Sequence, residues 1–191
     1  MNQGDTTVEV FGNRIRVLRT ADAIQGDVER MAAELRDLAG ERVPVLIGIL
    51  KGSFVLLADL IRVYGAPHEI DFLSLTRYDP TQRDPTAVKV LHDLKGNISG
   101  RLVVVVEGIR TAGTKIEYVD QFLHLHHPQA ILHCALVQQK GAIGGPIALH
   151  SRGFEIGNEF VVGYGLDLDE RHRNLPFVGA LESRPETGAA G

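Results

Sequence analysis

The spacing of apolar residues predicts two amphipathic helices in the first third of the chain. The first helix begins after Thr20, a residue type that caps helix N-termini, and ends before Gly40, which favours a helix C-terminus. Its apolar positions recur every three or four residues, at Ile24, Val28, Met31, Leu35 and Leu38. The second helix lies between Ser53 and Gly65 and has the same spacing. Its apolar positions are Phe54, Leu57, Ile61 and Tyr64.

Uninterrupted apolar runs predict strands that are covered on both faces. The clearest runs are Val43–Leu50 and Leu102–Val106, and the second is rich in β-branched residues. Further strand-like segments are Glu69–Thr76, Val88–Leu91, Ala130–Gln138 and Phe160–Leu166. A third helix is predicted from Thr114 to His126, because Pro128 stops it. Strands that alternate with helices predict an α/β domain with a largely parallel sheet.

Two segments lack the composition of a packed element. Arg77–Thr86 contains two prolines and mixed charges, so it predicts an exposed, mobile loop. Residues 183–191, SRPETGAAG, offer nothing to bury and predict a disordered tail. Residues 1–182 are therefore expected to form a single domain.

Composition and charge narrow the class of partner. The chain has 191 residues, 44% of them hydrophobic, and a formal net charge of -4, with no run of Lys or Arg. We therefore expect neither nucleic acid nor a membrane as a partner, and no apolar run approaches the roughly 18 residues of a membrane span. Cys134 is the single cysteine, which suits a reducing compartment, and we expect a cytoplasmic location. We expect Cys134 to be a buried small apolar residue, and the histidines at 124, 126 and 127 to form a polar helix face rather than a metal site.

Candidate chemistry lies where strands end and helices begin. Glu107 follows an apolar strand and precedes a short loop and a helix, so Thr111, Gly113 and Thr114 could hold a phosphate at a helix N-terminus. Glu107 could accept hydrogen bonds from sugar hydroxyls or face a metal. The alternative is an ordinary turn without a ligand. Lys51, at the end of another strand, could meet a second phosphate.

A third candidate segment follows the predicted strand near the C-terminus. Asp167 lies just beyond that strand and is followed by Glu170 and Arg173. A carboxylate there could hold a divalent metal, and the arginine could bind a diphosphate. The alternative is a solvated turn with an ion pair between residues three apart.

The order of these motifs resembles the hypoxanthine-guanine phosphoribosyltransferases, from about Val10 to Leu181. The segments that carry the resemblance are L-K-G-S-F, E-I-D-F-L-S-L-T-R-Y, V-V-V-V-E-G-I-R-T-A-G-T-K and F-V-V-G-Y-G-L-D. The resemblance implies a type I phosphoribosyltransferase fold with a small hood subdomain. It also implies transfer of ribose 5-phosphate from phosphoribosyl pyrophosphate to a purine, with magnesium and release of pyrophosphate, by a homodimer or homotetramer.

The resemblance also implies roles for individual residues. The pyrophosphate side would comprise Lys51, Gly52 and Arg173, with a Leu50–Lys51 peptide that is often cis in the family. The loop around the 5′-phosphate would comprise Thr111, Ala112, Gly113, Thr114 and Lys115. The base would be bound by Lys140, Phe160 and Val161. Asp167 and Glu107 would serve magnesium, and Glu107 would also face the ribose hydroxyls. Arg77 and Tyr78 begin the mobile loop, where the family usually has Ser-Tyr.

Three positions depart from the family pattern in the phosphate loop. Gly108 replaces the second of two adjacent acids, Arg110 replaces an aliphatic residue, and Thr111 replaces the aspartate that exchanges a proton with N7 of the purine. Glu107 and Thr111 therefore stand at the reacting centre without the usual general base, whose help is worth about 10²–10⁴-fold in rate. Either the substrate has changed or activity is lost, which would leave a nucleotide- or phosphoribosyl-pyrophosphate-binding protein.

One hypothesis explains these departures by a different base. In a 7-deazapurine, atom 7 is carbon, so an aspartate facing it would be a desolvated charge without a partner and Thr111 would be tolerated. Gly108 would leave room for a substituent such as the nitrile of 7-cyano-7-deazaguanine. Drift after loss of activity, or a slowed purine enzyme, would explain the same residues.

Overall fold

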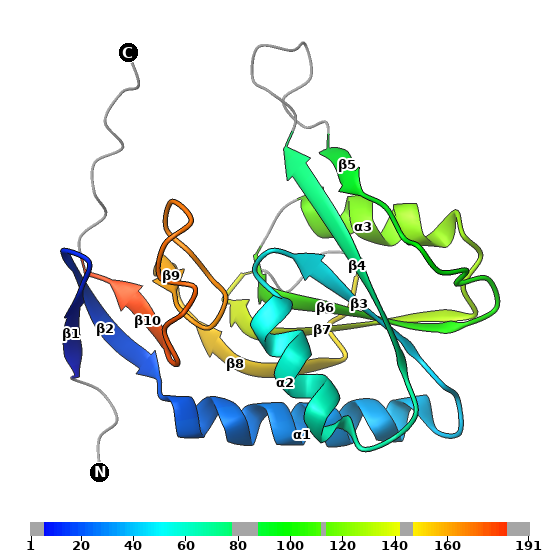
Figure 1. Ribbon diagram of the computed structural model, residues 1–191, viewed down its shortest axis with the longest axis horizontal. Coiled ribbons are helices and arrows are strands. Elements are labelled where there is room, and N and C mark those ends of the chain that lie inside the picture. Colours follow the sequence, from blue (N-terminus) through cyan, green and yellow to red (C-terminus); the bar gives the residue numbers. More distant parts are fainter. Residues whose placement is uncertain (1–5, 78–87, 112–113, 142–146, 183–191) are drawn as a thin grey trace.

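The main structural unit is a mixed sheet flanked by helices (Figure 1). The computed structural model describes residues 6–77, 88–111, 114–141 and 147–182. Within these residues the main sheet has six strands in the order β5-β4-β3-β6-β7-β8. Its strands are β3 (Val45–Leu50), β4 (Glu69–Arg77), β5 (Val88–His92), β6 (Leu102–Arg110), β7 (Ala130–Gln139) and β8 (Ser151–Ile156). Only the β4–β5 pair of this sheet is antiparallel, which confirms the largely parallel sheet.

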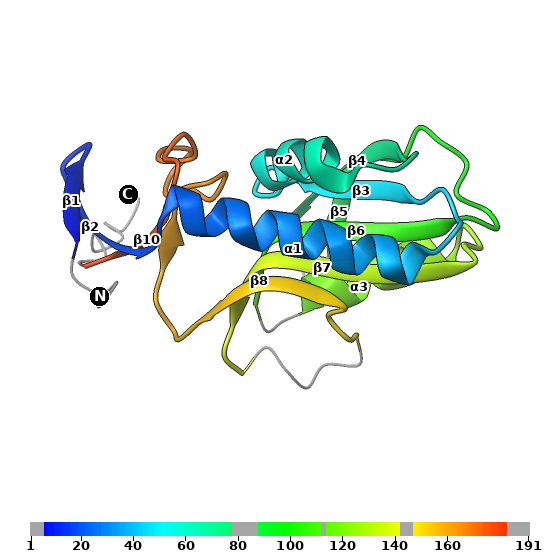
Figure 2. The same cartoon turned by 90° about the horizontal axis from the view of Figure 1, so that it is seen from below.

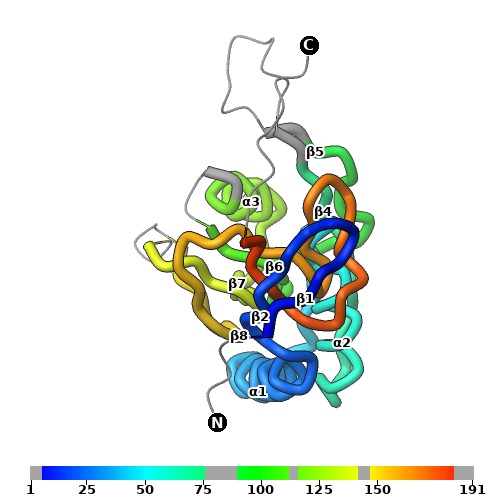
Figure 3. The backbone as a smooth tube through the Cα atoms, turned by 90° about the vertical axis from the view of Figure 1, so that its left-hand side faces the viewer, coloured from blue at the N-terminus to red at the C-terminus, as the bar shows by residue number. Residues whose placement is uncertain are grey.

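Helices cover both faces of this sheet (Figure 3). Helices α1 (Ala21–Ala39) and α2 (Phe54–Tyr64) pack on one face, and α3 (Thr114–His124) packs on the other. The apolar run of β6 serves both cores because successive side chains of a strand point to opposite faces. Val104 and Val106 join the cluster under α1 and α2, whereas Val103 and Val105 join the cluster under α3.

A second, antiparallel sheet forms the hood expected from the family resemblance. Its strands are β1 (Thr7–Val10), β2 (Asn13–Arg19), β10 (Val178–Leu181) and β9 (Val161–Val162), in that spatial order. It lies beyond the carboxyl ends of β6, β7 and β8 (Figures 1 and 2). Ile15, Val162 and Leu175 form its small core. The hood therefore faces the edge of the main sheet at which ligands bind in α/β proteins.

The limits of the predicted helices are largely confirmed. The Thr20 side chain accepts a hydrogen bond from the Ala23 N–H at 3.4 Å, and Gly40 follows the last residue of α1. Ser53 does precede α2, but its hydroxyl donates to the Ile49 carbonyl oxygen at 2.8 Å and does not cap the helix. The prediction for α3 was two residues too long, because the chain already leaves the helix after His124.

The strand predictions need three corrections. β6 does not end at Val106 but continues to Arg110, because it goes on pairing with β7. Phe160–Leu166 is not one strand, since only Val161–Val162 pairs with β10 and the chain then turns back on itself. The short or polar strands β1, β2, β8 and β10 were not predicted. The loop expected over Arg77–Thr86 begins one residue later, because Arg77 is the last residue of β4 and pairs with Val88. The rest of that loop and the expected tail lie outside the described residues, and no described helix could span a membrane.

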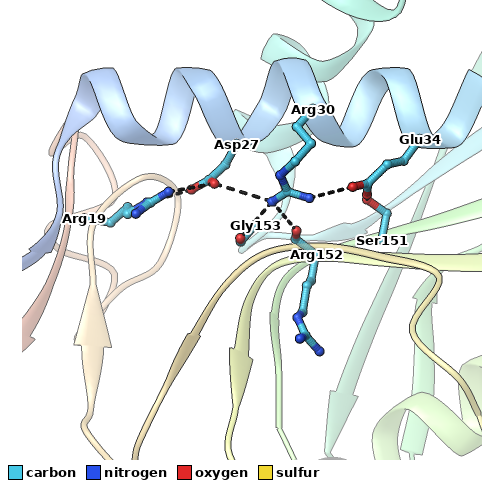
Figure 4. A network of polar contacts seen from close by, with 7 residues as sticks. All are labelled: Arg19, Asp27, Arg30, Glu34, Ser151, Arg152 and Gly153. Carbon is cyan, nitrogen blue, oxygen red and sulfur yellow. Dashed lines mark hydrogen bonds and ion pairs between the residues drawn. The ribbon is translucent and has the colours of Figure 1, made fainter.

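A chain of charged groups fastens α1 to both sheets (Figure 4). Buried Asp27 of α1 accepts two hydrogen bonds of 2.7 Å from Arg19, which ends β2. Arg30 also contacts Asp27 and donates to two carbonyl oxygens of β8, those of Arg152 at 2.7 Å and of residue 153 at 2.9 Å. Glu34 accepts from Arg30 and, at 2.6 Å, from the Ser151 hydroxyl. This network ties the hood to the helix and covers the edge strand β8.

Candidate functional site

The loop between β3 and α2 packs against two glycines from distant parts of the chain. The Leu50–Lys51 peptide is cis, which confirms the expectation from the family resemblance. A Cβ atom on Gly108 would lie 2.3 Å from the Gly52 carbonyl oxygen, and one on Gly165 would lie 2.8 Å from the same oxygen. Both distances are too short for a side chain. The loop at Lys51, the end of β6 and the segment that follows β9 are therefore in direct contact.

This contact corrects the expectation that Gly108 leaves room for a larger substrate. The space beside Gly108 is filled by the Gly52 backbone and, 3.0 Å from the position of a Cβ atom, by the side chain of Leu166. The absence of a side chain at position 108 thus allows two backbone segments to approach closely, rather than opening a cavity.

Lys51 and Arg173 converge on one carboxylate. The Lys51 Nζ and the Arg173 Nη2 each lie 3.0 Å from the Glu170 Oε2. Arg173 also contacts Asp167 Oδ1 at 2.8 Å and donates to the Gly165 carbonyl oxygen at 2.8 Å. Hydrogen bonds from Lys51 and then from Arg173 hold the pKa of Glu170 below its usual value. Two cations that are distant in the sequence thus meet at the side chain of one glutamate.

Glu107 is paired with the arginine that departs from the family pattern. The Arg110 Nε donates to Glu107 Oε2 at 2.7 Å, and Arg110 Nη2 also contacts that oxygen. Arg110 is only 4% exposed, and its Nη1 reaches the Ile147 carbonyl oxygen at 3.4 Å. The carboxylate predicted to face the ribose therefore has a buried counter-charge from its own strand. Neighbouring Cys134 is fully buried, and burial raises the pKa of its thiol, as expected for a small apolar residue.

Comparison with known proteins gives a consistent assignment. The model of the phosphoribosyl transferase domain matches residues 18–169. The hypoxanthine-guanine phosphoribosyltransferase of Mycobacterium avium is 34% identical over 174 residues, which are 88% of this chain and 86% of that protein. The chain belongs to the hypoxanthine-guanine phosphoribosyltransferase family.

Other members of the family agree with this assignment. The hypoxanthine phosphoribosyltransferase of Salmonella typhimurium is 38% identical over 137 residues, covering 72% of this chain and 77% of that protein. The crystal structure of a hypoxanthine-guanine phosphoribosyltransferase from Bacillus anthracis superimposes with a TM-score of 0.81 at 34% identity. The superposition covers 86% of this chain and 97% of that one. The type I phosphoribosyltransferase fold is thereby confirmed.

The phosphate loop of the family is only partly described here. Thr111 is exposed and directly follows β6. Ala112 and Gly113 lie outside the described residues, and the backbones of Thr114 and Lys115 form the first turn of α3. The N–H groups of a helix's first turn lack partners within the helix and can bind a phosphate.

The residues expected at the base lie on the hood side of the site. Lys140 is exposed just after β7, and its N–H donates to the Ile156 carbonyl oxygen at 2.8 Å. Phe160 packs against the hood core while remaining half-buried, and Val161 is buried in β9. The Lys140 backbone is thus bound to the last residue of β8, and the chain from β8 leads to Phe160. The role of each residue toward a base stays a prediction.

The donor set suits magnesium only together with a substrate. The described residues contain no group of three or more His, Cys, Asp or Glu that could hold a metal. Magnesium in phosphate-binding sites takes one or two carboxylates, water and phosphate oxygens. Both candidate carboxylates are paired with an arginine, Asp167 with Arg173 and Glu107 with Arg110. Asp167 fits the pattern better because its side chain is 30% exposed, against 12% for Glu107.

Sequence reasoning missed the pairing of Arg110 with Glu107, because Arg110 was noticed only as a departure from the family pattern. The alternative of an ion pair between residues three apart in a solvated turn is confirmed by Glu170 and Arg173, since the Glu170 side chain is 64% exposed. The spacing of three residues in both pairs was visible in the sequence. The contact of Glu170 with Lys51 depends on tertiary structure, and no local signal could have shown it.

Proposed function

We propose that this protein transfers ribose 5-phosphate from phosphoribosyl pyrophosphate to a purine or purine-like base and releases pyrophosphate. The observation that carries this proposal is the convergence of Lys51 and Arg173 at the edge of the sheet where β3 and β6 end. That edge also presents the N-terminus of α3, so sites for two phosphate groups lie on one side of the molecule.

Lys51 and Arg173 would bind the pyrophosphate end of the substrate. Their positive charges offset the negative charge that grows on the leaving group as the bond to the ribose breaks. Magnesium, when bound, would supply further positive charge to the pyrophosphate, and Asp167 would hold it. The close contact of Gly52 with Gly108 holds the loop at Lys51 against β6.

Glu107 would orient the ribose. Because Arg110 holds its carboxylate, Glu107 would present an acceptor of fixed orientation to the ribose hydroxyls. The phosphate would be bound by residues 111–115. Fixing both ends of the ribose positions its anomeric carbon between the leaving group and the base.

The base would be recognised by Lys140 at its oxo group, by Phe160 at its ring face and by the Val161 backbone at its edge. Thr111 has no carboxylate and cannot serve as the general base. A base that needs no proton exchange at position 7, such as a 7-deazaguanine, is compatible with this threonine. That hypothesis now rests on Thr111 alone, because no room exists beside Gly108.

Three other features complete the proposal. A binding protein without catalysis is not favoured, because the relatives are phosphoribosyltransferases and this chain matches them over most of their length. A homodimer or homotetramer and a cytoplasmic location remain part of the proposal. The same holds for magnesium as cofactor.

Pyrophosphate release tests the proposed reaction. The protein is incubated with magnesium chloride, phosphoribosyl pyrophosphate and, separately, hypoxanthine, guanine, xanthine, adenine and 7-deazaguanine derivatives. We expect release that depends on one of these bases. Binding of phosphoribosyl pyrophosphate without release in the presence of any base would overturn the proposal in favour of a binding protein.

A further inference from the structure

Glu170 bridges two cations that the proposed function assigns to pyrophosphate. Lys51 and Arg173 approach the same oxygen, Oε2, at 3.0 Å each. The Glu170 side chain is 64% exposed, whereas that of Arg173 is only 17% exposed. The arginine is therefore fixed in the fold, and the carboxylate is the partner that can move into water.

The turn formed by residues 167–173 places the Glu170 side chain beside Lys51 and Arg173. The Glu170 N–H donates to Asp167 Oδ2 at 3.0 Å, while Asp167 Oδ1 binds Arg173. Asp169 and Glu170 have φ values of 50° and 63°, in the left-handed region that non-glycine residues rarely adopt. Such a conformation costs free energy and persists where the surroundings determine it.

We propose that Glu170 is an internal counter-anion that occupies the pyrophosphate position between Lys51 and Arg173 and exchanges with pyrophosphate as it binds and leaves. This inference rests on the proposed function, because it takes these two cations as the pyrophosphate site. Pyrophosphate carries more charge and more oxygen acceptors than one carboxylate, so it displaces Glu170. The displaced side chain is already mostly exposed, so its return to water costs little.

The exchange would lower the affinity of the protein for pyrophosphate. Without Glu170, Lys51 would lose the carboxylate that it contacts and Arg173 would keep Asp167, so an incoming pyrophosphate would gain more of the attraction of the two cations. With Glu170, part of that attraction is already satisfied. Glu170 therefore weakens the binding of pyrophosphate and shortens the time that it stays bound.

Calorimetry with magnesium pyrophosphate as the probe tests this inference. In Glu170→Gln, which keeps the side-chain size and removes the charge, we expect the dissociation constant to fall about three- to tenfold, as for the loss of two competing surface ion pairs. Glu29→Gln is the matched control, because Glu29 is exposed on α1 and contacts Gln25 rather than the site. It changes the net charge equally and should leave the dissociation constant unchanged. Glu170→Ala should act in the same direction as Glu170→Gln, and thermal unfolding checks that both variants are folded.

Lys51→Met separates this inference from the proposed function. If Lys51→Met weakens pyrophosphate binding but neither Glu170 variant strengthens it, the counter-anion role is wrong and the pyrophosphate site stands. Weaker binding in Glu170→Gln would likewise overturn the inference, because Glu170 would then be a ligand of the complex. If Lys51→Met leaves binding unchanged, the assignment of the pyrophosphate site itself fails.

Discussion

The carbonyl oxygen of Gly52 lies 2.3 Å from the position that a Cβ atom on Gly108 would take. This contact joins the cis-peptide loop after β3 to the end of β6, two segments that the proposed reaction needs side by side. The family pattern given by the sequence resemblance has an acid at position 108, and this contact leaves no space for such a side chain here.

Restoring that acid should not restore the family's site. Gly108→Asp and Gly108→Ala force the Gly52 backbone away, and overpacking of this kind costs about 1–3 kcal/mol of unfolding free energy. We expect both variants to lose stability in urea and to bind phosphoribosyl pyrophosphate more weakly. A Gly108→Asp variant of unchanged stability and higher transferase activity would contradict this role of the glycine.

Removing Arg110 should destabilise the protein through Glu107. Arg110→Leu leaves the Glu107 carboxylate without its buried partner, and breaking such a pair costs about 3–5 kcal/mol. Since Glu107 is not fully buried, we expect a loss near the lower limit, measured by urea unfolding. The double variant Arg110→Leu/Glu107→Gln should recover part of the loss, and strictly additive losses would show that the two residues do not interact.

The buried His133 should make stability depend on pH. Burial lowers its pKa from 6.5 to about 4, although a hydrogen bond of 2.9 Å to Asp120 acts in the opposite direction. The unfolded chain therefore takes up a proton that the folded chain does not, so this contribution is complete above pH 6.5 and is lost as the pH falls toward 4.

His133→Gln isolates that contribution. Between pH 7.5 and 5.5 the original protein should lose about 1 kcal/mol more unfolding free energy than the variant, because other titrating groups are common to both. Urea unfolding at both pH values measures the difference. Parallel pH profiles would show that His133 does not titrate differently in the folded and unfolded states.

Arg30 should contribute more to stability than an ordinary surface arginine. Arg30→Met removes two hydrogen bonds to the carbonyl oxygens of β8 and the contact with Asp27, with an expected loss of about 1–2 kcal/mol. Arg62→Met is the control, because the Arg62 side chain is 70% exposed and, among the described residues, its ion pair is with Asp59 of the same helix. Its expected loss is below about 0.5 kcal/mol. Equal losses in the two variants would contradict a fastening role of Arg30.

Position 111 should determine which base is preferred. We expect the original protein to turn over 7-deazaguanine derivatives faster than guanine, and Thr111→Asp to shift the preference toward guanine, because a carboxylate can exchange a proton with N7. The measurement is kcat/KM for each base. Turnover of guanine by the unmodified protein at a rate that Thr111→Asp does not raise would show that the missing carboxylate does not matter.

The order of apolar and polar residues within single segments predicted the helices and strands that are buried in the core of the main sheet. β3, β6 and the two helices on one face were all evident from runs or spacing of apolar residues. The strands of the hood were not, because β1 and β2 are only partly buried and alternate polar with apolar side chains over short lengths. β10 contributes only four residues, and its partners are remote in the sequence.

The site shows the same division. Residue types near the predicted strand ends indicated Lys51 and Asp167, which the structure connects through Glu170 and Arg173. Glu107 was expected to follow its strand, but it lies inside β6. The reason for Gly108 was predicted wrongly, because a missing side chain gives no sign in the sequence of what fills its place. Only the three-dimensional structure shows that the carbonyl oxygen of Gly52 fills the space beside Gly108.

The pairing of β2 with β10 has a consequence for synthesis of the protein on the ribosome. Residues 15–19 must wait for residues 178–181 before the hood can close, although the helices and strands between them can already pack. A chain still in production thus has its main sheet but lacks the antiparallel sheet that closes one side of the ligand-binding edge. Premature termination between β8 and β10 would leave the six strands of the main sheet and remove the strand that joins β2 to β9, so we expect such a fragment to lose ligand binding while most of the core of the main sheet remains.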